Sequence, residues 1–152
     1  MSQPVIRRGE IPDIDQLVAM RRDFTFEDEE GLERPEYEDE CRAFLAAAIE
    51  RGHWQIWVAA IDGRIVSHVY MALVDKVPRP IREHRRISYL TNVYTRPEFR
   101  GRGIGSRLLE QAQKAAREAD VELMLVWPSE DSTDFYRQHG FASSGEPFVW
   151  EA

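Results

Sequence analysis

The sequence is poor in residues that crosslink a chain or bind metals. It has one cysteine, Cys41, so no disulfide can form within the chain. Its four histidines are scattered and show no metal-ligand spacing, and we therefore predict no metal site. Cys41 lies among apolar residues at helical spacing, which favours a buried structural thiol over a catalytic one.

Long apolar runs are also missing. No run reaches the roughly 18 residues that a membrane-spanning helix needs, and residues 1–10 lack the apolar stretch of a signal peptide. We therefore expect a cytoplasmic protein without a membrane partner. The length of 152 residues predicts one domain, 1–152, large enough to bury a core without crosslinks.

A positive net charge is absent as well. The formal net charge is −7, which argues against nucleic acid as a partner because duplex binding depends on cationic contacts to phosphate. The charge is uneven, since residues 27–40 are strongly acidic and residues 79–102 are rich in arginine. The two segments suit either a cationic substrate beside an anionic cofactor, or a solvated surface.

The apolar residues that are present follow the periods of strands and helices. Strands are predicted at 4–8, 54–61, 64–74, 87–95, 121–127 and 147–150. Helices are predicted from Pro12, up to Arg51, over 103–119 and over 132–139. Asp62-Gly63 predicts a two-residue hairpin turn, and the nearly continuous apolar run 121–127 predicts a buried central strand. This order predicts an α/β fold of the mixed α+β kind, in which a mostly antiparallel sheet carries helices on both faces.

Residues 89–107 carry the pattern that points most directly to chemistry. A strand ends there, a loop with three glycines follows, and a helix begins at the loop. Glycines let a backbone approach a ligand, and the first N–H groups of a helix attract anions, so a phosphate or pyrophosphate is the expected ligand. A turn that only fixes strand–helix packing is the alternative. The spacing is not that of the dinucleotide fingerprint, and no G-K-[ST] sequence follows.

This segment resembles the acyl-CoA site of the GNAT superfamily of N-acetyltransferases. Arg100, Gly103 and Gly105 fill the signature [Q/R]-x-x-G-x-[G/A], after the lead-in residues Val93, Thr95 and Pro97. The segment Phe135–Phe141 matches the family's second mark, a tyrosine before x-x-x-G-F. The resemblance covers nearly the whole chain. It implies the GNAT fold and the transfer of an acetyl group from acetyl-CoA to an amine.

The resemblance also implies roles for single residues. Backbone groups of Val93 and Thr95 would hold the pantetheine arm, the Val93 N–H would polarise the thioester carbonyl, and Tyr136 would protonate the leaving thiolate. A core aromatic is the alternative for Tyr136. Ser129 stands where many relatives carry asparagine, which puts one cofactor contact in doubt. The residues expected to bind acetyl-CoA are Val93, Tyr94, Thr95, Arg100, Gly101, Arg102, Gly103, Ile104, Gly105, Ser106, Ser129, Ser132 and Tyr136.

The acceptor side is predicted mainly from position. A primary amine must lose a proton before it attacks. The candidate bases are Glu27 and Asp28 near the end of the first helix and Glu29, Glu30 or Glu33 in the loop after it, with solvated charge as the alternative for each. The residues expected to contact the acceptor are Phe24, Phe26, Glu27, Asp28, Tyr89 and Asn92. The acidic segment favours a small cationic amine, attacked directly in a ternary complex.

Further alternatives stay open at this stage. A non-catalytic acyl-CoA sensor would share the glycine-rich loop but would not need Tyr136. The arginine-rich stretch Arg79–Arg86 is either a solvated loop or a contact for a cofactor phosphate or the acceptor. The resemblance also allows a homodimer.

Overall fold

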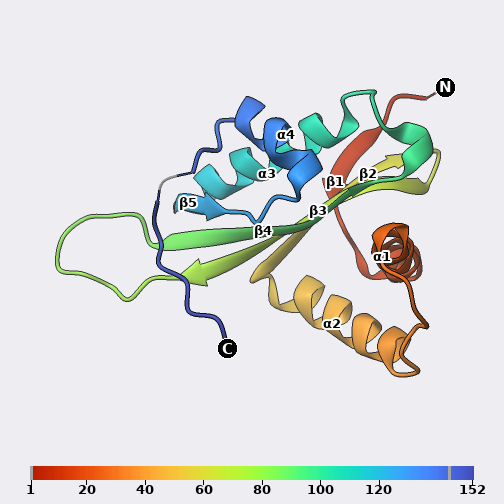
Figure 1. The fold of residues 1–152 in the computed structure, drawn as a ribbon. Coiled ribbons are helices and arrows are strands. Elements are labelled where there is room, and N and C mark those ends of the chain that lie inside the picture. The colour runs from red at the N-terminus through yellow and green to blue at the C-terminus, as the bar shows by residue number, and fades with distance from the viewer. Residues whose placement is uncertain (1, 144) are drawn as a thin grey trace.

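A twisted five-stranded sheet forms the centre of the protein in the computed structural model, which describes residues 2–143 and 145–152 (Figure 1). The strands lie in the order β1-β2-β3-β4-β5. Their bounds are Val5–Arg8 (β1), Trp54–Ile61 (β2), Arg64–Asp75 (β3), Arg86–Thr95 (β4) and Val121–Leu125 (β5). All neighbouring strands are antiparallel except β4 and β5, which are parallel. The predicted mixed, mostly antiparallel sheet is therefore confirmed.

Helices cover both faces of this sheet (Figure 1). The helices α1 (Ile14–Asp28) and α2 (Tyr37–Arg51) pack on one face, and α3 (Ile104–Glu118) packs on the other together with the short α4 (Thr133–Gln138). Within the described residues no helix is both long and apolar enough to cross a membrane.

The alternation of side chains along β3 divides the core into two clusters. Ile65 packs toward α1 and α2, whereas the next residue, Val66, packs toward α3, because successive strand residues point to opposite faces. On the α3 side Leu108 and Leu109 are fully buried, and on the α1 side Leu17 is. The two clusters hold β3 and β4 between the helices and fix the position of the loop that follows β4.

The hairpin between β2 and β3 forms as predicted. Asp62 and Gly63 have φ values of 50° and 81°, so both adopt the left-handed conformation that a type I′ turn requires. Ile61 lies opposite Arg64 directly beside the turn. The turn therefore sets the register of β2 and β3 beside it.

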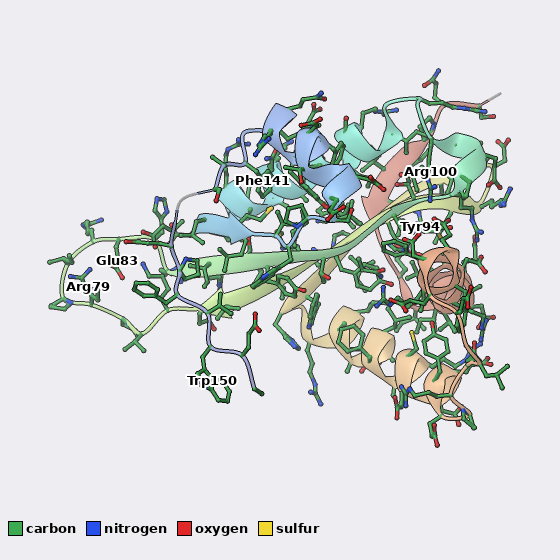
Figure 2. All side chains as sticks on the ribbon, viewed as in Figure 1. Arg79, Glu83, Tyr94, Arg100, Phe141 and Trp150 are labelled. Atoms are coloured by element: carbon green, nitrogen blue, oxygen red, sulfur yellow. The ribbon has the colours of Figure 1, made fainter. Side chains whose placement is uncertain are left out.

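Two predictions about the C-terminal part are wrong. The strand at 121–127 is an edge strand that ends at Leu125, and Leu123 is 45% exposed, so it is not a buried central strand. Residues 147–150 form no strand, and Phe148 and Trp150 are 100% and 86% exposed. Trp150 points away from the ribbon in Figure 2. An extended apolar segment becomes a strand only when its backbone groups find a partner, and this one pairs with no strand of the described chain.

Candidate active site

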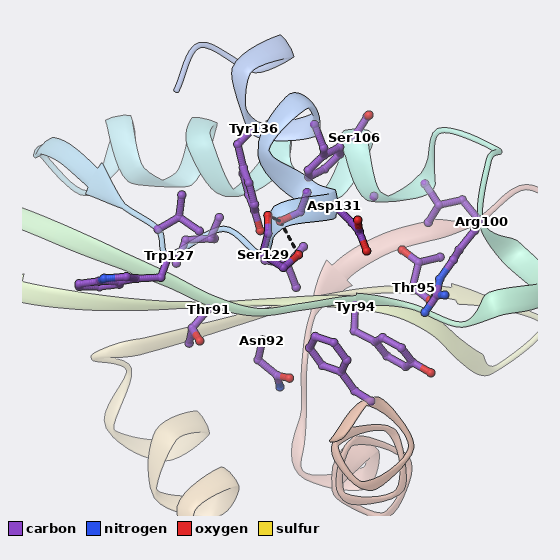
Figure 3. A pocket seen from close by; sticks show the side chains of 18 of the residues that line it. Thr91, Asn92, Tyr94, Thr95, Arg100, Ser106, Trp127, Ser129, Asp131 and Tyr136 are labelled. Carbon is purple, nitrogen blue, oxygen red and sulfur yellow. Dashed lines mark hydrogen bonds between the residues drawn. The ribbon is translucent and has the colours of Figure 1, made fainter. Parts of the chain in front are cut away.

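A cavity of about 760 Å³ opens where β4 and β5 separate. The two strands pair only as far as Tyr89 and Leu125, although β4 continues to Thr95. Residues 89–95 of β4 form one wall of the cavity, and α3 and α4 contribute the opposite wall (Figure 3). The free length of β4 therefore presents strand backbone to a ligand instead of to a neighbouring strand.

The loop after β4 leads into an open helix N-terminus at one end of this cavity. Gly101 and Gly103 have φ values of 73° and 75°, which favour glycine, and Gly103 is the N-cap of α3. The first turn of α3 contains no acidic residue, and the cavity is lined by Gly103, Ile104, Gly105 and Ser106. Unpaired N–H groups and the helix dipole make this end of the cavity fit an anion such as a pyrophosphate.

The side chain of Arg100 does not serve as a free cation for that anion. Its Nη2 donates to both carboxylate oxygens of Glu27 at 2.8 and 3.0 Å, and its Nε donates to the Thr95 carbonyl at 2.9 Å. Its guanidinium also lies 5.6 Å from the ring centroid of Tyr94, beside which it stands in Figure 2. Arg100 thus ties the loop to the end of β4 and to α1.

Glu27 is held as a carboxylate by this arrangement. Burial alone raises the pKa of Glu27, but hydrogen bonds from Arg100 and from the Tyr94 hydroxyl, at 2.7 Å, outweigh burial, and the pKa lies below its usual value. The Tyr94 phenol conversely has its pKa raised to about 12, by burial and by the hydrogen bond to Glu27. A carboxylate with a lowered pKa is a weak proton acceptor, which disfavours Glu27 as a general base.

A bulge interrupts the pairing of β3 and β4 in the middle of the cavity wall. Tyr70 lies opposite Thr91 and His68 lies opposite Tyr94, so Asn92 and Val93 together face one residue of β3. Asn92 has a φ of 50°, outside the range of regular strands. The Asn92 carbonyl accepts a hydrogen bond from Nδ1 of His68 at 2.8 Å.

His68 holds this bulge from a fully buried position in β3. Burial lowers the pKa of His68 to about 4, so its ring is neutral at pH 7. Since Nδ1 donates to the Asn92 carbonyl, Nε2 carries no proton, and Nε2 has no hydrogen-bond partner within the described residues. A neutral imidazole on the neighbouring strand β3 therefore stabilises the bulge at Asn92 and Val93 through this hydrogen bond.

Tyr136 of α4 reaches the cavity from the wall opposite β4 (Figure 3). Tyr136 is 7% exposed, and its ring packs edge to face against Phe135 and Phe141. Burial raises the pKa of Tyr136 to about 12, so the phenol stays protonated at neutral pH. Tyr136 is thus both a core aromatic and a hydroxyl donor at the cavity surface.

The two predicted serines lie at the N-terminal end of α4. The Ser129 hydroxyl donates to the Ser132 hydroxyl at 2.9 Å, the dashed line in Figure 3, and Ser132 donates to the Ser129 carbonyl at 3.1 Å. Both serines line the cavity. Nearby, the rings of Tyr89 and Trp127 meet edge to face at 5.4 Å and form the end of the cavity away from the glycine loop.

Most predicted site residues line the cavity, but four do not. Phe24, Tyr89 and Asn92 from the acceptor side are in its lining. The predicted site residues outside the lining are Phe26, Glu27, Asp28 and Arg102. The Arg102 guanidinium donates to the Glu98 carbonyl at 3.0 Å and stacks 5.3 Å from the ring centroid of Phe99.

Sequence reasoning missed several residues of the lining. They are Arg21, Leu90, Thr91, Phe99, Val126, Trp127, Asp131 and Phe135. Thr91 follows Tyr89 by two residues along β4, and Arg21 precedes Phe24 by about one helical turn, so both could have been found from spacing.

The arginine-rich stretch Arg79–Arg86 and the acidic segment 27–40 lie outside the lining of this cavity. Arg79 ion-pairs with Glu83, and Figure 2 places both in the loop at the far end of the sheet from Arg100. Arg85 pairs with Asp120 in the same region. The solvated-loop interpretation of the arginine-rich stretch agrees with this position. Within the described chain no cluster of three or more His, Cys, Asp or Glu side chains is placed to hold a metal.

The sequence of residues 16–141 matches the family described as the acetyltransferase (GNAT) family. The chain belongs to the GNAT acetyltransferase family. Membership confirms the resemblance predicted from the loop and from Tyr136, and with it acetyl-CoA as the cosubstrate.

Individual relatives agree with this assignment. An uncharacterized N-acetyltransferase of Archaeoglobus fulgidus is 28% identical over 141 residues, covering 91% of this chain and 89% of that one. A predicted acetyltransferase from Clostridium acetobutylicum, solved with acetyl-CoA, has a TM-score of 0.82 at 22% identity and covers 97% of this chain and 96% of its own. A GCN5-related N-acetyltransferase from Ralstonia eutropha has a TM-score of 0.79 at 20% identity, with 97% and 98% covered. At such identities the two structures establish the shared fold.

Proposed function

We propose that this GNAT protein transfers the acetyl group of acetyl-CoA to a primary amine of a small molecule, by direct attack within a ternary complex. The observation that carries the proposal is the continuity of one cavity. It joins the open N-terminus of α3, the free length of β4 and the hydroxyl side of Tyr136. These are an anion site, a strand-like binding edge and a proton donor, in the order in which an acyl-CoA molecule presents its groups.

Acetyl-CoA supplies an activated acyl carbon that a neutral amine can attack. The N–H groups at the start of α3 would bind the pyrophosphate, and the backbone of Val93 and Thr95 would orient the pantetheine arm. The bulge held by His68 turns the Val93 backbone out of the regular ladder, which suits an N–H that polarises the carbonyl.

The transfer forms one C–N bond and breaks one C–S bond, and the amine loses a proton while the sulfur gains one. Tyr136 suits the sulfur side, because its pKa of about 12 keeps its hydroxyl protonated until the thiolate forms. Glu27 is a poor candidate for the amine's proton, since its carboxylate is bound by Arg100 and Tyr94. Water in the open cavity is the simpler acceptor of that proton.

The variant Tyr136→Phe tests the proposal. It removes the hydroxyl but keeps the ring that packs on Phe135 and Phe141, so we expect kcat to fall by about 10²-fold while the dissociation constant of acetyl-CoA changes by less than about threefold. Steady-state release of CoA measures the first quantity and calorimetry the second. Tyr94→Phe is the matched control, since its hydroxyl serves Glu27, and we expect its kcat to stay within about threefold of wild type.

Equal kcat values for wild type and Tyr136→Phe would contradict the role of the hydroxyl. If acetyl-CoA binds but neither protein releases CoA with any amine, the non-catalytic sensor becomes the better description. Loss of acetyl-CoA binding in Tyr136→Phe would instead mean that the ring shapes the cavity and does not act on the sulfur.

A further inference from the structure

A second cavity adjoins the first on the α1 and α2 face of the sheet. Its volume is about 420 Å³, and it shares Arg21, Thr91 and Asn92 with the acetyl-CoA cavity. The shared residues include Asn92, whose neighbour Val93 lines the acetyl-CoA cavity and is proposed to polarise the thioester. A molecule whose amine reaches the thioester would therefore extend past Arg21 into this second cavity, which we name the α2 cavity.

The walls of the α2 cavity are mainly apolar and aromatic. Phe44 and Trp54 meet edge to face at 5.3 Å, and the lining continues with Cys41, Leu45 and Tyr70. Such a surface favours a bulky apolar group, since burial of apolar area drives binding.

The charges around the α2 cavity are positive in sum. Its carboxylate, Glu40, is bound by Arg34 at 2.6 Å, so that pair is neutral. Arg21 is different, because it forms no ion pair with any carboxylate in the described part of the chain. Its Nη1 donates to Oδ1 of Asn92 at 3.2 Å, and its guanidinium lies 5.8 Å from the ring centroid of Phe24. Arg21 thus places an uncompensated cation where the two cavities meet.

The neighbouring arginines are already neutralised, which makes Arg21 the exception. Arg22 pairs with Glu33, Arg96 with Asp23, and Arg100 with Glu27. The acidic segment 27–40 was expected to attract a cationic acceptor, but five of its carboxylates form ion pairs with arginines: Glu27, Glu33, Glu36, Glu38 and Glu40. Of this segment, Glu40 is the carboxylate that lines the α2 cavity. The lining does not support a cationic acceptor. On the opposite wall of the acetyl-CoA cavity, Asp131 belongs to the α4 side, away from the α2 cavity.

We propose that Arg21 binds the carboxylate of an α-amino acid whose bulky apolar side chain occupies the α2 cavity and whose amino group receives the acetyl group. The inference rests on the proposed acetyl transfer and names its acceptor class. A guanidinium binds a carboxylate through parallel N–H groups, and Arg21 has donors beyond the one that serves Asn92.

The test compares phenylalanine with 2-phenylethylamine, which lacks the carboxylate but keeps the ring and the amine. In the wild-type protein we expect kcat/KM to be at least about tenfold higher for phenylalanine, and higher for phenylalanine than for alanine. Arg21→Gln should lower kcat/KM for phenylalanine by about tenfold or more and leave 2-phenylethylamine within about threefold. Arg22→Gln makes the same change of charge one residue further along α1, on a side chain that faces Glu33, and should alter neither substrate.

Binding is measured separately, so that the acceptor class and the transfer activity can fail independently. With the product CoA present, phenylalanine should raise the melting temperature of the wild-type protein and of Arg22→Gln, but not of Arg21→Gln. If phenylalanine stabilises the proteins in this pattern but no CoA is released from acetyl-CoA, the proposed function is wrong and the amino-acid site stands. If 2-phenylethylamine is used as well as phenylalanine, or Arg21→Gln impairs both equally, the inference is overturned and the transfer activity stands. If neither amine binds or reacts, the inference is overturned, and other primary amines then test the transfer activity.

Discussion

Acid should destabilise this protein through one buried imidazole, that of His68. The pKa of His68 is lowered from 6.5 to about 4 because the ring is buried, and the cations of Arg21 and Arg96 lower it further. An unfolded chain therefore binds a proton at His68 between pH 6.5 and 4 that the folded chain excludes. Stability from this group is fully present above pH 6.5 and is lost as the pH falls toward 4.

The size of the effect follows from the shift. One pKa unit corresponds to 1.36 kcal/mol, so the full loss is about 3 kcal/mol, of which about 2 kcal/mol has already gone at pH 5. Because small domains are stable by only about 5–15 kcal/mol, a loss of this size is readily measured. Burial of a neutral ring is thus expected to account for a large share of the acid sensitivity of the protein.

Urea unfolding at pH 7 and pH 5, followed by tryptophan fluorescence, measures the effect in wild type and in His68→Asn. The asparagine keeps a side-chain N–H near the place of Nδ1, which bonds the Asn92 carbonyl, but it does not titrate. The variant is expected to be less stable at pH 7, since it leaves a void, yet to lose about 2 kcal/mol less than wild type on going to pH 5. Equal losses in the two proteins would refute the reasoning, because carboxylates titrate in both.

Two further predictions concern the loop and its anchor. Glu27→Gln should lower the free energy of unfolding by less than about 1 kcal/mol, measured by urea unfolding, and leave kcat for CoA release within about threefold. If Glu27 were the general base, the same variant would lower kcat by about 10²-fold or more. Gly103→Ala should lose about 1–2 kcal/mol, because its φ of 75° strains any side chain, and should also weaken acetyl-CoA binding in calorimetry. Gly63→Ala, at a φ of 81° in the hairpin turn, should lose similar stability with unchanged binding, and weakened binding in that control would remove the special role of the loop.

Local patterns predicted most of the fold. The pair Asp62-Gly63 favours left-handed backbone at both positions, so it predicted the β2–β3 turn. The apolar face of α3 predicted that helix to within one residue at each end. In both cases the residues whose conformational preferences decide the structure lie within one short segment of the sequence.

Predictions that needed a distant partner were the ones that failed. The apolar run at 121–127 resembles a central strand, but whether it is central depends on a further strand beyond it, and residues 147–150 do not supply one. Arg100 matched the family signature, yet its guanidinium binds Glu27, which lies 73 residues away in the sequence. No local pattern reports such a pairing, so the sequence predicted the position of Arg100 but not the use of its side chain.

The pairing of Arg100 with Glu27 has a mechanical consequence for the whole site. The loop that precedes α3 is joined through Arg100 to the C-terminal end of α1, and the same helix carries Phe24 and Arg21 on the acceptor side. Phe24 in turn stacks on Tyr94 of β4 at 4.7 Å. The acetyl-CoA loop and the proposed acceptor pocket are therefore held against one strand by the same helix. Because α1 contacts both sites, a ligand that orders one of them reduces the conformational entropy left to lose at the other, which favours binding of the two substrates together.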